Sequence, residues 1–241
     1  MTIDAGIEVR FWAGTSLSVT GTLDVNGVSG SEVSFLSDAD TPAAGDWTGL
    51  VLGSASSGTL DYATVRHASI GVDSTGGANL TEVALVDGQT GVQIAGGSAT
   101  LSQVTTSDNT NYGVYVTGGT SVTLVTLSGL TSQRNDYGLY VWANSTVDVS
   151  GSTLTDNTTS GVLTDGAISY APALTIGGSS IHSNLGSHDL WAQRYLNAGE
   201  QVLQATGNWW GSTEEATIAL RDRRQLLQGR RQPISAFSRF T

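Results

Sequence analysis

The sequence contains no cysteine, no lysine and only three prolines. The absence of cysteine excludes a disulfide framework and a thiolate metal site. Few prolines beside 31 glycines in 241 residues indicate many turns between short regular segments, not a proline-rich disordered chain. No apolar run approaches the roughly 20 residues that a transmembrane helix needs. We therefore expect a folded domain without a membrane span, held together by packing and backbone pairing.

Positive charge is also scarce. The net charge is −11, with 21 acidic and 10 basic residues, and every basic residue is an arginine. Six of the ten arginines fall within residues 221–241, so an acidic body precedes an arginine-rich tail. Because the acidic body repels phosphate, we expect no nucleic-acid partner. The tail contacts either an external anion or the acidic body, and we favour the second interpretation.

A short phrase recurs along the chain, consisting of a glycine followed by a strand-like run such as Gly-Val-Tyr-Val. It begins at Gly71, Gly91, Gly113, Gly138 and Gly161, with a looser copy from Ser187. Between the phrases lie runs in which apolar residues alternate, as in residues 99–104, 121–125 and 145–149. Such alternation is typical of a half-buried strand. An asparagine precedes successive phrases, at Asn109, Asn135, Asn157 and Asn184.

Recurrence about every 20 to 25 residues indicates a solenoid. One unit cannot bury its apolar side chains alone, whereas coils stacked about 4.8 Å apart form a continuous core with like residues above like. We expect the asparagines to hydrogen-bond along the stack through their amides. We expect the recurrent glycines to supply a tight turn at one corner of each coil. An antiparallel sandwich explains the short strands but not the fixed period.

Four segments resemble a known family. Residues 14–23, 45–50 and 60–68 resemble the opening phrases, and residues 207–211 (Gly-Asn-Trp-Trp-Gly) the closing coil, of the pectin-lyase-like parallel β-helix repeat proteins of bacterial secreted and cell-surface polypeptides. The resemblance implies an all-β, single-stranded right-handed parallel β-helix of about 8–9 coils. We place this β-helix at residues 1–212, with residues 213–241 as an arginine-rich capping segment packed on the last coil. Residues 37–46 are expected to form a protruding loop, after which Trp47 re-enters the core.

The resemblance also implies an extracellular or bacterial cell-surface location. The opening Met1-Thr2-Ile3-Asp4 lacks the basic start and apolar stretch of a signal peptide. If the protein is secreted, we expect these residues to belong to a mature fragment behind an added methionine.

Several relatives with the β-helix fold that this sequence resembles cleave acidic polysaccharides, which makes catalytic residues of that kind one possibility for this chain. A lyase of that kind uses an arginine or lysine base, and the candidate here is Arg134, which the repeat places between Asp108 and Asp156. An arginine between two carboxylates is held protonated, so we favour an alternating charge ladder on a solvated face. The paired carboxylates of a polygalacturonase-like hydrolase are not recognised. A polysaccharide lyase or glycoside hydrolase acting on an acidic polysaccharide stays the alternative.

Three acids in one expected loop, Asp38, Asp40 and Asp46, are the only metal-ligating candidates. Calcium favours several oxygen ligands, but this spacing matches no recognised calcium motif. Solvation of the loop is the simpler explanation. We therefore expect no cofactor, with Ca²⁺ as the alternative.

Aromatic residues gather on one expected face. Tyr115 and Tyr140 point outward because the apolar residues on either side of them point inward. The candidate ligand-binding residues are Tyr112, Tyr115, Tyr137, Tyr140, Trp142, Trp191 and Asp165. Trp142 and Trp191 are expected to occupy equivalent positions just beyond their phrases. Two interpretations stay open: a sugar-binding surface, or rings that cover loops and stack across coils for stability.

Together these patterns predict a non-catalytic extracellular module. It serves as a structural spacer or as a carbohydrate- or surface-binding domain of a larger bacterial surface protein. Its expected partners are a polysaccharide or cell-surface glycan and the neighbouring domains of the same polypeptide. An ice-binding β-helix is a further alternative, which requires regular outward threonine rows, and the threonine spacing in the sequence is irregular.

Overall fold

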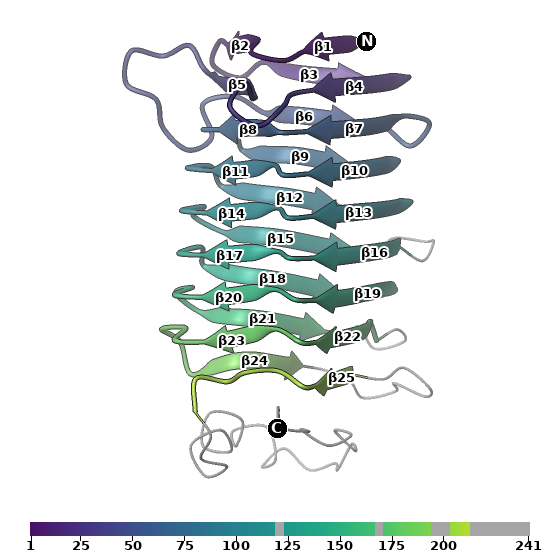
Figure 1. Cartoon of the computed structure of the whole chain (residues 1–241), viewed down its shortest axis with the longest axis vertical. Helices are drawn as coiled ribbons and strands as arrows, with labels where there is room; N and C mark the ends of the chain where they lie inside the picture. The colour runs from purple at the N-terminus through teal and green to yellow at the C-terminus, as the bar shows by residue number, and fades with distance from the viewer. Residues whose placement is uncertain (119–122, 167–170, 194–202, 213–241) are drawn as a thin grey trace.

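A computed structural model describes residues 1–118, 123–166, 171–193 and 203–212. The chain winds into a tall stack of coils, with its N-terminus at one end of the stack (Figure 1). All strands pair in parallel, and neighbours within a sheet differ by three in strand number, so each coil adds one strand to each of three sheets. The prediction of an all-β parallel solenoid is confirmed.

Sheet A contains nine strands and sheets B and C contain eight each. Sheet A consists of β1 (Thr2–Asp4), β4 (Thr22–Asn26), β7 (Ser57–Asp61), β10 (Gly77–Thr81), β13 (Ser98–Ser102), β16 (Thr123–Ser128), β19 (Ser145–Ser150), β22 (Ala173–Gly177) and β25 (Leu203–Thr206). Sheet B consists of β2 (Glu8–Phe11), β5 (Val33–Ser37), β8 (Ala63–Arg66), β11 (Ala84–Val86), β14 (Thr105–Ser107), β17 (Thr131–Gln133), β20 (Thr153–Thr155) and β23 (Ser180–His182). Sheet C consists of β3 (Ser16–Val19), β6 (Gly49–Leu52), β9 (Ile70–Ser74), β12 (Thr90–Ile94), β15 (Tyr112–Thr117), β18 (Tyr137–Trp142), β21 (Ser160–Asp165) and β24 (His188–Gln193).

The core is one continuous column of apolar side chains between the three sheets. In β15, Val114 and Val116 are fully buried while Tyr115 between them is only partly buried, which confirms the expected alternation. At the N-terminal end, residues 38–46 project from the stack between β5 and β6 (Figure 1). Trp47 then re-enters the core, where its ring stacks on Phe11 at a centroid distance of 4.0 Å.

The asparagine ladder forms as expected inside the corner between sheets B and C. The side-chain Nδ2 of Asn109 donates to Oδ1 of Asn135 at 2.9 Å, and the same bond joins Asn135 to Asn157 and Asn157 to Asn184. Each of these Oδ1 atoms also accepts the backbone N–H of the preceding asparagine at 3.1 Å. The amides therefore satisfy buried backbone groups as well as one another, as buried polar groups require.

The recurrent glycines do not make turns, so that prediction is wrong. They lie inside the strands of sheet C, and none of the five has a positive φ. A Cβ on Gly113 would lie 2.6 Å from the carbonyl oxygen of Gly138, and one on Gly138 would lie 2.5 Å from that of Gly161. Glycine is needed here because the backbone of the next coil approaches too closely for any side chain.

The turns come instead from two columns of residues in the left-handed conformation. Between sheets B and C, six residues have φ from 55° to 64°: His67, Asp87, Asp108, Arg134, Asp156 and Ser183. Between sheets A and B they are Tyr62, Glu82, Gln103, Gly129, Gly151, Gly178 and Gly207. Left-handed backbone is uncommon for residues other than glycine, asparagine and aspartate, so strain is expected at corners such as those of His67, Glu82 and Arg134 and not at the glycine corners.

The closing coil is partly as expected. Asn208 is buried, and its Oδ1 accepts the backbone N–H of Ser179 while its Nδ2 donates to the carbonyl of Ile176. Trp210 packs against the core, whereas Trp209 is exposed. The predicted capping segment, residues 213–241, lies outside the described residues. In the described part of the chain, no helix is long and apolar enough to cross a membrane.

Candidate functional site

The outward face of sheet C carries four tyrosines on two adjacent coils. Tyr112 and Tyr115 belong to β15, Tyr137 and Tyr140 to β18, and the register places Tyr112 beside Tyr137 and Tyr115 beside Tyr140. We call these four residues the tyrosine cluster. The burial of Val114, Val116, Leu139 and Val141 on the other face of the strands accounts for the outward direction of Tyr115 and Tyr140. The rings of Tyr112 and Tyr137, at the starts of the two strands, lie on the same side because they pack against each other and Tyr112 packs against Tyr115.

The four rings pack against one another. The ring centroids of Tyr115 and Tyr140 are 5.1 Å apart with planes at 28°, and those of Tyr112 and Tyr137 are 5.6 Å apart with planes at 29°. Tyr112 also stacks on Tyr115 within the same strand, at 5.2 Å. Aromatic pairs of this kind stabilise a fold beyond their buried area. The rings therefore stack across coils, and their roles in stability and in ligand binding both stay predictions.

Their hydroxyl groups stay protonated at neutral pH. Burial raises the pKa of Tyr112, Tyr115 and Tyr137 above the usual value for tyrosine. Burial and the nearby Asp165 carboxylate raise the pKa of Tyr140 further. Because the ring faces between neighbours are covered, the cluster presents ring edges and neutral hydroxyl groups that both donate and accept hydrogen bonds.

Trp142 extends the cluster along β18. It follows Tyr140 by two residues, so both side chains leave the same face of the sheet, and Trp142 is 36% exposed. Its partners in the neighbouring strands are Thr117 and Asp165. Trp142 therefore offers an accessible aromatic face beside rings that are already stacked.

Trp191 does not occupy the position equivalent to Trp142, so that expectation is wrong. The register of β24 aligns His188 with Ser160 and Trp191 with Leu163, which in turn aligns with Tyr140. Asp189, not Ser187, thus stands where earlier coils have their glycine. The shift of two residues keeps Trp191 on the outward face because side chains alternate with period two. There its ring stacks on His188 at a centroid distance of 5.2 Å.

Two carboxylates lie beside the tyrosine cluster, and a third lies further along the column of Tyr115. Asp165 accepts a hydrogen bond from the hydroxyl group of Tyr140 at 3.2 Å and is almost fully buried. Asp136 directly precedes Tyr137 and accepts a bond from the hydroxyl group of Thr159. Asp73 lies two coils toward the N-terminus, in the column of Tyr115, where Nε2 of Gln93 donates to it at 3.2 Å. Burial raises the pKa of Asp73.

Of these carboxylates, only Asp165 was among the predicted site residues. Asp73 follows Gly71 by two residues, just as Tyr115 follows Gly113, so the two residues occupy equivalent positions in their glycine phrases. This equivalence can be read from the sequence. Asp189, in the glycine position of its coil, accepts hydrogen bonds from the backbone N–H and Nδ2 of Asn184.

Arg134 forms a bidentate ion pair with Asp108 at the corner between sheets B and C. Its Nε and terminal nitrogen donate to the two carboxylate oxygens of Asp108 at 2.7 and 2.8 Å. This hydrogen-bonded pair raises the pKa of Arg134 and lowers that of Asp108. A group held protonated in this way is the opposite of a general base. The geometry fits the charge ladder, with Arg66 and Asp87 pairing at 2.6 Å further up the same margin.

Replacing Arg134 by glutamine is expected to lower the free energy of unfolding by less than about 1 kcal/mol, because both side chains of the pair are largely solvated. The contribution of Asp108, whose pKa is lowered, is present above its unfolded pKa of about 3.9 and is lost as the pH falls through the lower folded value. Urea denaturation of both proteins at pH 7 and at pH 3 measures it. A loss above about 2 kcal/mol at pH 7 would contradict a solvated ladder.

The three acids of the loop, Asp38, Asp40 and Asp46, share no common ligand position. Asp46 accepts hydrogen bonds from the hydroxyl group of Ser37 at 2.7 Å and the backbone N–H of Ala43 at 2.9 Å, and these bonds lower its pKa. Asp38 accepts the indole N–H of Trp12 at 3.1 Å, and Asp40 is exposed. Within residues 1–118, 123–166, 171–193 and 203–212, no three His, Asp or Glu side chains gather as a metal site. The geometry therefore does not favour Ca²⁺ at these acids.

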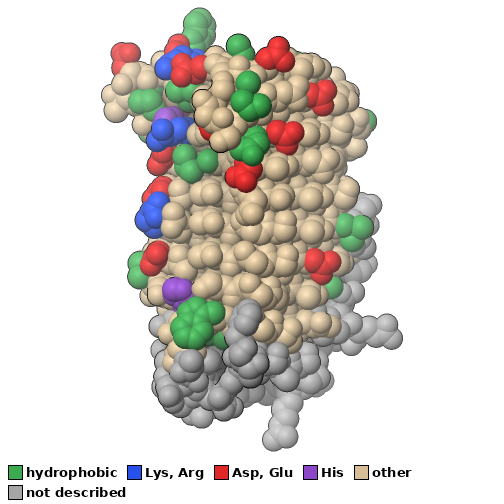
Figure 2. Space-filling model, viewed as in Figure 1, with side chains coloured by type: hydrophobic (Ala, Val, Ile, Leu, Met, Phe, Trp, Pro, Cys, Tyr) green, Lys and Arg blue, Asp and Glu red, His purple; other side chains and the backbone are tan. Residues whose placement is uncertain are grey.

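On the face formed by sheets A and B, acidic side chains are spread over the upper half, and the lower half is largely uncharged (Figure 2). The parallel register aligns Thr59, Asn79, Thr100, Thr126, Asp148 and Thr175 in one outward column of sheet A. Unequal loops between coils conceal this alignment in the sequence. The column is nevertheless interrupted by an amide and a carboxylate, so it is not an unbroken threonine row of the kind an ice-binding face requires.

Comparison with known proteins concerns the fold. The crystal structure of pectate lyase Pel9A is similar, with 15% sequence identity and a TM-score of 0.47, over 87% of this chain and 62% of that chain. This chain thus spans less than two thirds of the length of the lyase. No curated protein sequence matches significantly. The family model described as "Right handed beta helix region" matches residues 48–190, more than half of the sequence. The chain belongs to this right-handed β-helix family.

Proposed function

We propose that the protein is a non-catalytic extracellular β-helix module of a larger surface protein, a rigid spacer that binds carbohydrate on the outward face of sheet C. The observation that carries the proposal is the tyrosine cluster, with Trp142 exposed beside it. The role as a spacer is supported by the continuous apolar core and the hydrogen-bonded asparagine ladder. Both tie successive coils together, so the module resists bending.

The chemistry of the cluster suits a sugar. Tyrosine and tryptophan combine an apolar ring with a polar group, and sugars likewise present apolar C–H faces between hydroxyl groups. Trp142 supplies an accessible ring face, while the phenol hydroxyl groups supply donors and acceptors. Because the tyrosine rings are already packed against one another, little side-chain freedom is lost on binding.

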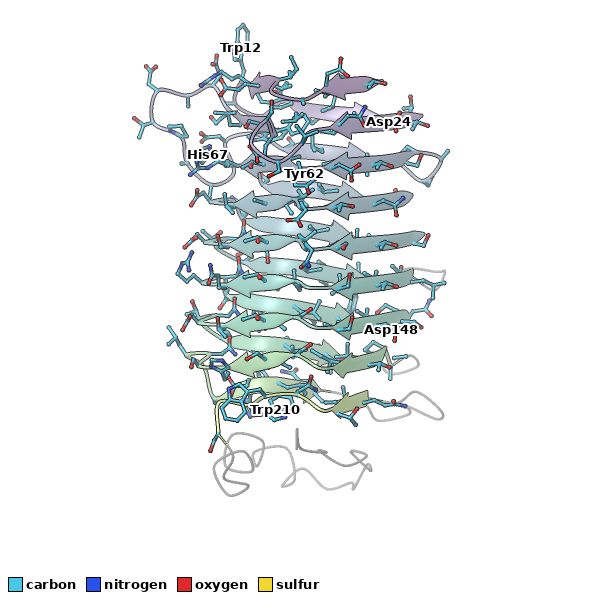
Figure 3. The ribbon with its side chains drawn as sticks, in the orientation of Figure 1. Trp12, Asp24, Tyr62, His67, Asp148 and Trp210 are labelled. Carbon is cyan, nitrogen blue, oxygen red and sulfur yellow. The ribbon has the colours of Figure 1, made fainter. Side chains whose placement is uncertain are left out.

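A glycan array followed by affinity electrophoresis tests the proposal. We expect the wild-type protein to retain at least one glycan, and the Tyr115→Ala, Tyr140→Ala, Trp142→Ala triple variant to bind it at least tenfold more weakly. Trp12→Ala is the matched control, because it removes an exposed tryptophan from the N-terminal end of the stack (Figure 3). Circular dichroism verifies that all variants fold. Absence of binding by the wild type would reject the carbohydrate-binding role.

A further inference from the structure

The aromatic surface on sheet C is long in one direction only. Along β18 it extends from Tyr137 to Trp142, which is about 17 Å at the rise of a β-strand. Along the stack it covers two coils, because the other rings, Tyr112 and Tyr115, belong to the adjacent strand β15, about 4.8 Å away. The strands run across the long axis of the stack, so this surface lies crosswise on the molecule (Figure 1).

The coils on either side end the surface in the axial direction. On the C-terminal side, β21 aligns Ser160, Leu163 and Asp165 with the aromatic residues of β18, and these three are 0%, 5% and 3% exposed. On the N-terminal side, β12 places the amide of Gln93 beside the cluster, and its Nε2 donates to Asp73 at 3.2 Å. A ligand that ran along the stack would therefore leave the rings after two coils, whereas one that ran along β18 would contact them over the length of the strand.

We infer that the glycan bound by the tyrosine cluster lies across the stack along β18, and that its class is a straight β-1,4-linked chain. This inference rests on the proposed function and adds the direction, the length and the linkage of the ligand. Roughly three sugar rings placed end to end fit on about 17 Å of strand. β-1,4 links between equatorial positions keep successive rings in line, as a straight strand requires, whereas α-1,4 links make a chain curve away from it. Trp142 then contacts the ring at one end of the bound segment.

This direction suits a spacer. A polysaccharide that lies along β18 crosses the long axis of the stack, so the module projects from the polymer instead of lying along it (Figure 1). The bound segment occupies only the coils of β15 and β18. The other coils then set the distance between the polymer and the rest of the polypeptide.

Isothermal titration with cello-oligosaccharides of one to six glucose units tests the length and the linkage. We expect the affinity to rise with each ring up to about three and then to level off. Maltohexaose, which has the same composition with α-1,4 links, is expected to bind roughly tenfold more weakly than cellohexaose. These sugars are uncharged, so attraction to carboxylates does not contribute to the comparison.

The outcomes separate this inference from the proposed function. An affinity that still rises steeply at the hexamer, or maltohexaose binding as tightly as cellohexaose, overturns the inference. If no cello-oligosaccharide binds although the array identifies another glycan, the inference fails and the proposed function stands. If no glycan binds at all, the proposed function itself fails.

Two substitutions test the direction. Trp142→Ala removes one end of the aromatic surface, so we expect cellohexaose to bind roughly tenfold more weakly and the affinity to level off at a shorter chain. Gln93→Ala is the matched control, because Gln93 lies one coil from Tyr115 along the stack, and is expected to leave the affinity for cellohexaose unchanged. Equal losses in these two variants would place the ligand along the stack and overturn the inference. Trp142→Phe keeps an aromatic ring and is expected to retain most of the affinity, which separates lost stacking from misfolding.

Discussion

Gly138→Ala is expected to lower the free energy of unfolding by about 4 kcal/mol. The added Cβ would lie 2.5 Å from the carbonyl oxygen of Gly161 and 2.8 Å from Nδ2 of Asn157. The first is backbone that sheet C holds in register, and the second belongs to the asparagine ladder. Neither can withdraw without breaking hydrogen bonds between coils, so overpacking and lost hydrogen bonds act together. Guanidinium denaturation followed by circular dichroism measures the effect.

Gly21→Ala is the matched control for this substitution. Gly21 is exposed, its φ is not positive, and a Cβ there would meet nothing within 4 Å. We therefore expect the free energy of unfolding to change by less than about 0.5 kcal/mol. A Gly138→Ala protein as stable as Gly21→Ala would show that the coils can separate at little cost, contrary to the close approach of their backbones.

Asn135→Ala is expected to cost a similar amount, about 4 kcal/mol, by leaving buried groups without partners. Oδ1 of Asn135 accepts hydrogen bonds from the backbone N–H of Asn109 at 3.1 Å and from the side-chain Nδ2 of Asn109 at 2.9 Å. Its own Nδ2 donates to the carbonyl oxygen of Thr106 at 3.1 Å. Alanine cannot replace any of these bonds, and water has no access because Asn135 is fully buried. Chemical denaturation measures the loss.

Two further substitutions separate burial from hydrogen bonding. Asn79→Ala removes an exposed asparagine from sheet A and is expected to change stability by less than about 0.5 kcal/mol. Asn135→Asp preserves the shape and the acceptor but removes the donors, so we expect it to be as damaging as alanine or more so at neutral pH. Full stability of the aspartate variant would rule out the donated bonds as a source of stability.

The period of the sequence predicted the solenoid because the period belongs to the repeat itself. Stacking places residues one period apart next to one another, so Asn109, Asn135 and Asn157 predicted their own ladder. Likewise, alternation within one strand predicted that Tyr115 and Tyr140 point outward. Features that depend on equivalent residues in successive coils were therefore accessible before the structure.

Features that depend on distances between coils were not accessible. Glycine serves both left-handed turns and close backbone approaches, and only the position of the next coil distinguishes them at Gly113 and Gly138. The corner residues between sheets B and C vary in type, with His67, Arg134 and Ser183 beside three aspartates, so their common left-handed conformation is not marked by one residue in the sequence. Trp191 was misplaced because its coil has Asp189 in place of the glycine that marks the register elsewhere.

For the candidate site, the sequence predicted which aromatic residues gather but not how they lie. The sequence does not distinguish rings that spread their faces toward solvent from rings that stack, as Tyr112, Tyr115, Tyr137 and Tyr140 do. The side-chain torsions decide between them and have no period. The carboxylates beside the cluster were also missed in part, because Asp136 lies outside the recurrent phrase.

The asparagine ladder has a direction. Each Oδ1 accepts from the preceding coil, whereas each Nδ2 donates both to a backbone carbonyl of the preceding coil and to the next acceptor along the ladder, from Asn109 to Oδ1 of Asp189. An ionised carboxylate accepts hydrogen bonds but donates none, so the ladder ends at Asp189. A duplicated coil between Asn109 and Asn184 would lengthen the column without new chemistry, whereas one appended after Asp189 would have to start another. The ladder at this corner thus passes from side chains that both accept and donate to one that only accepts from it, Asp189.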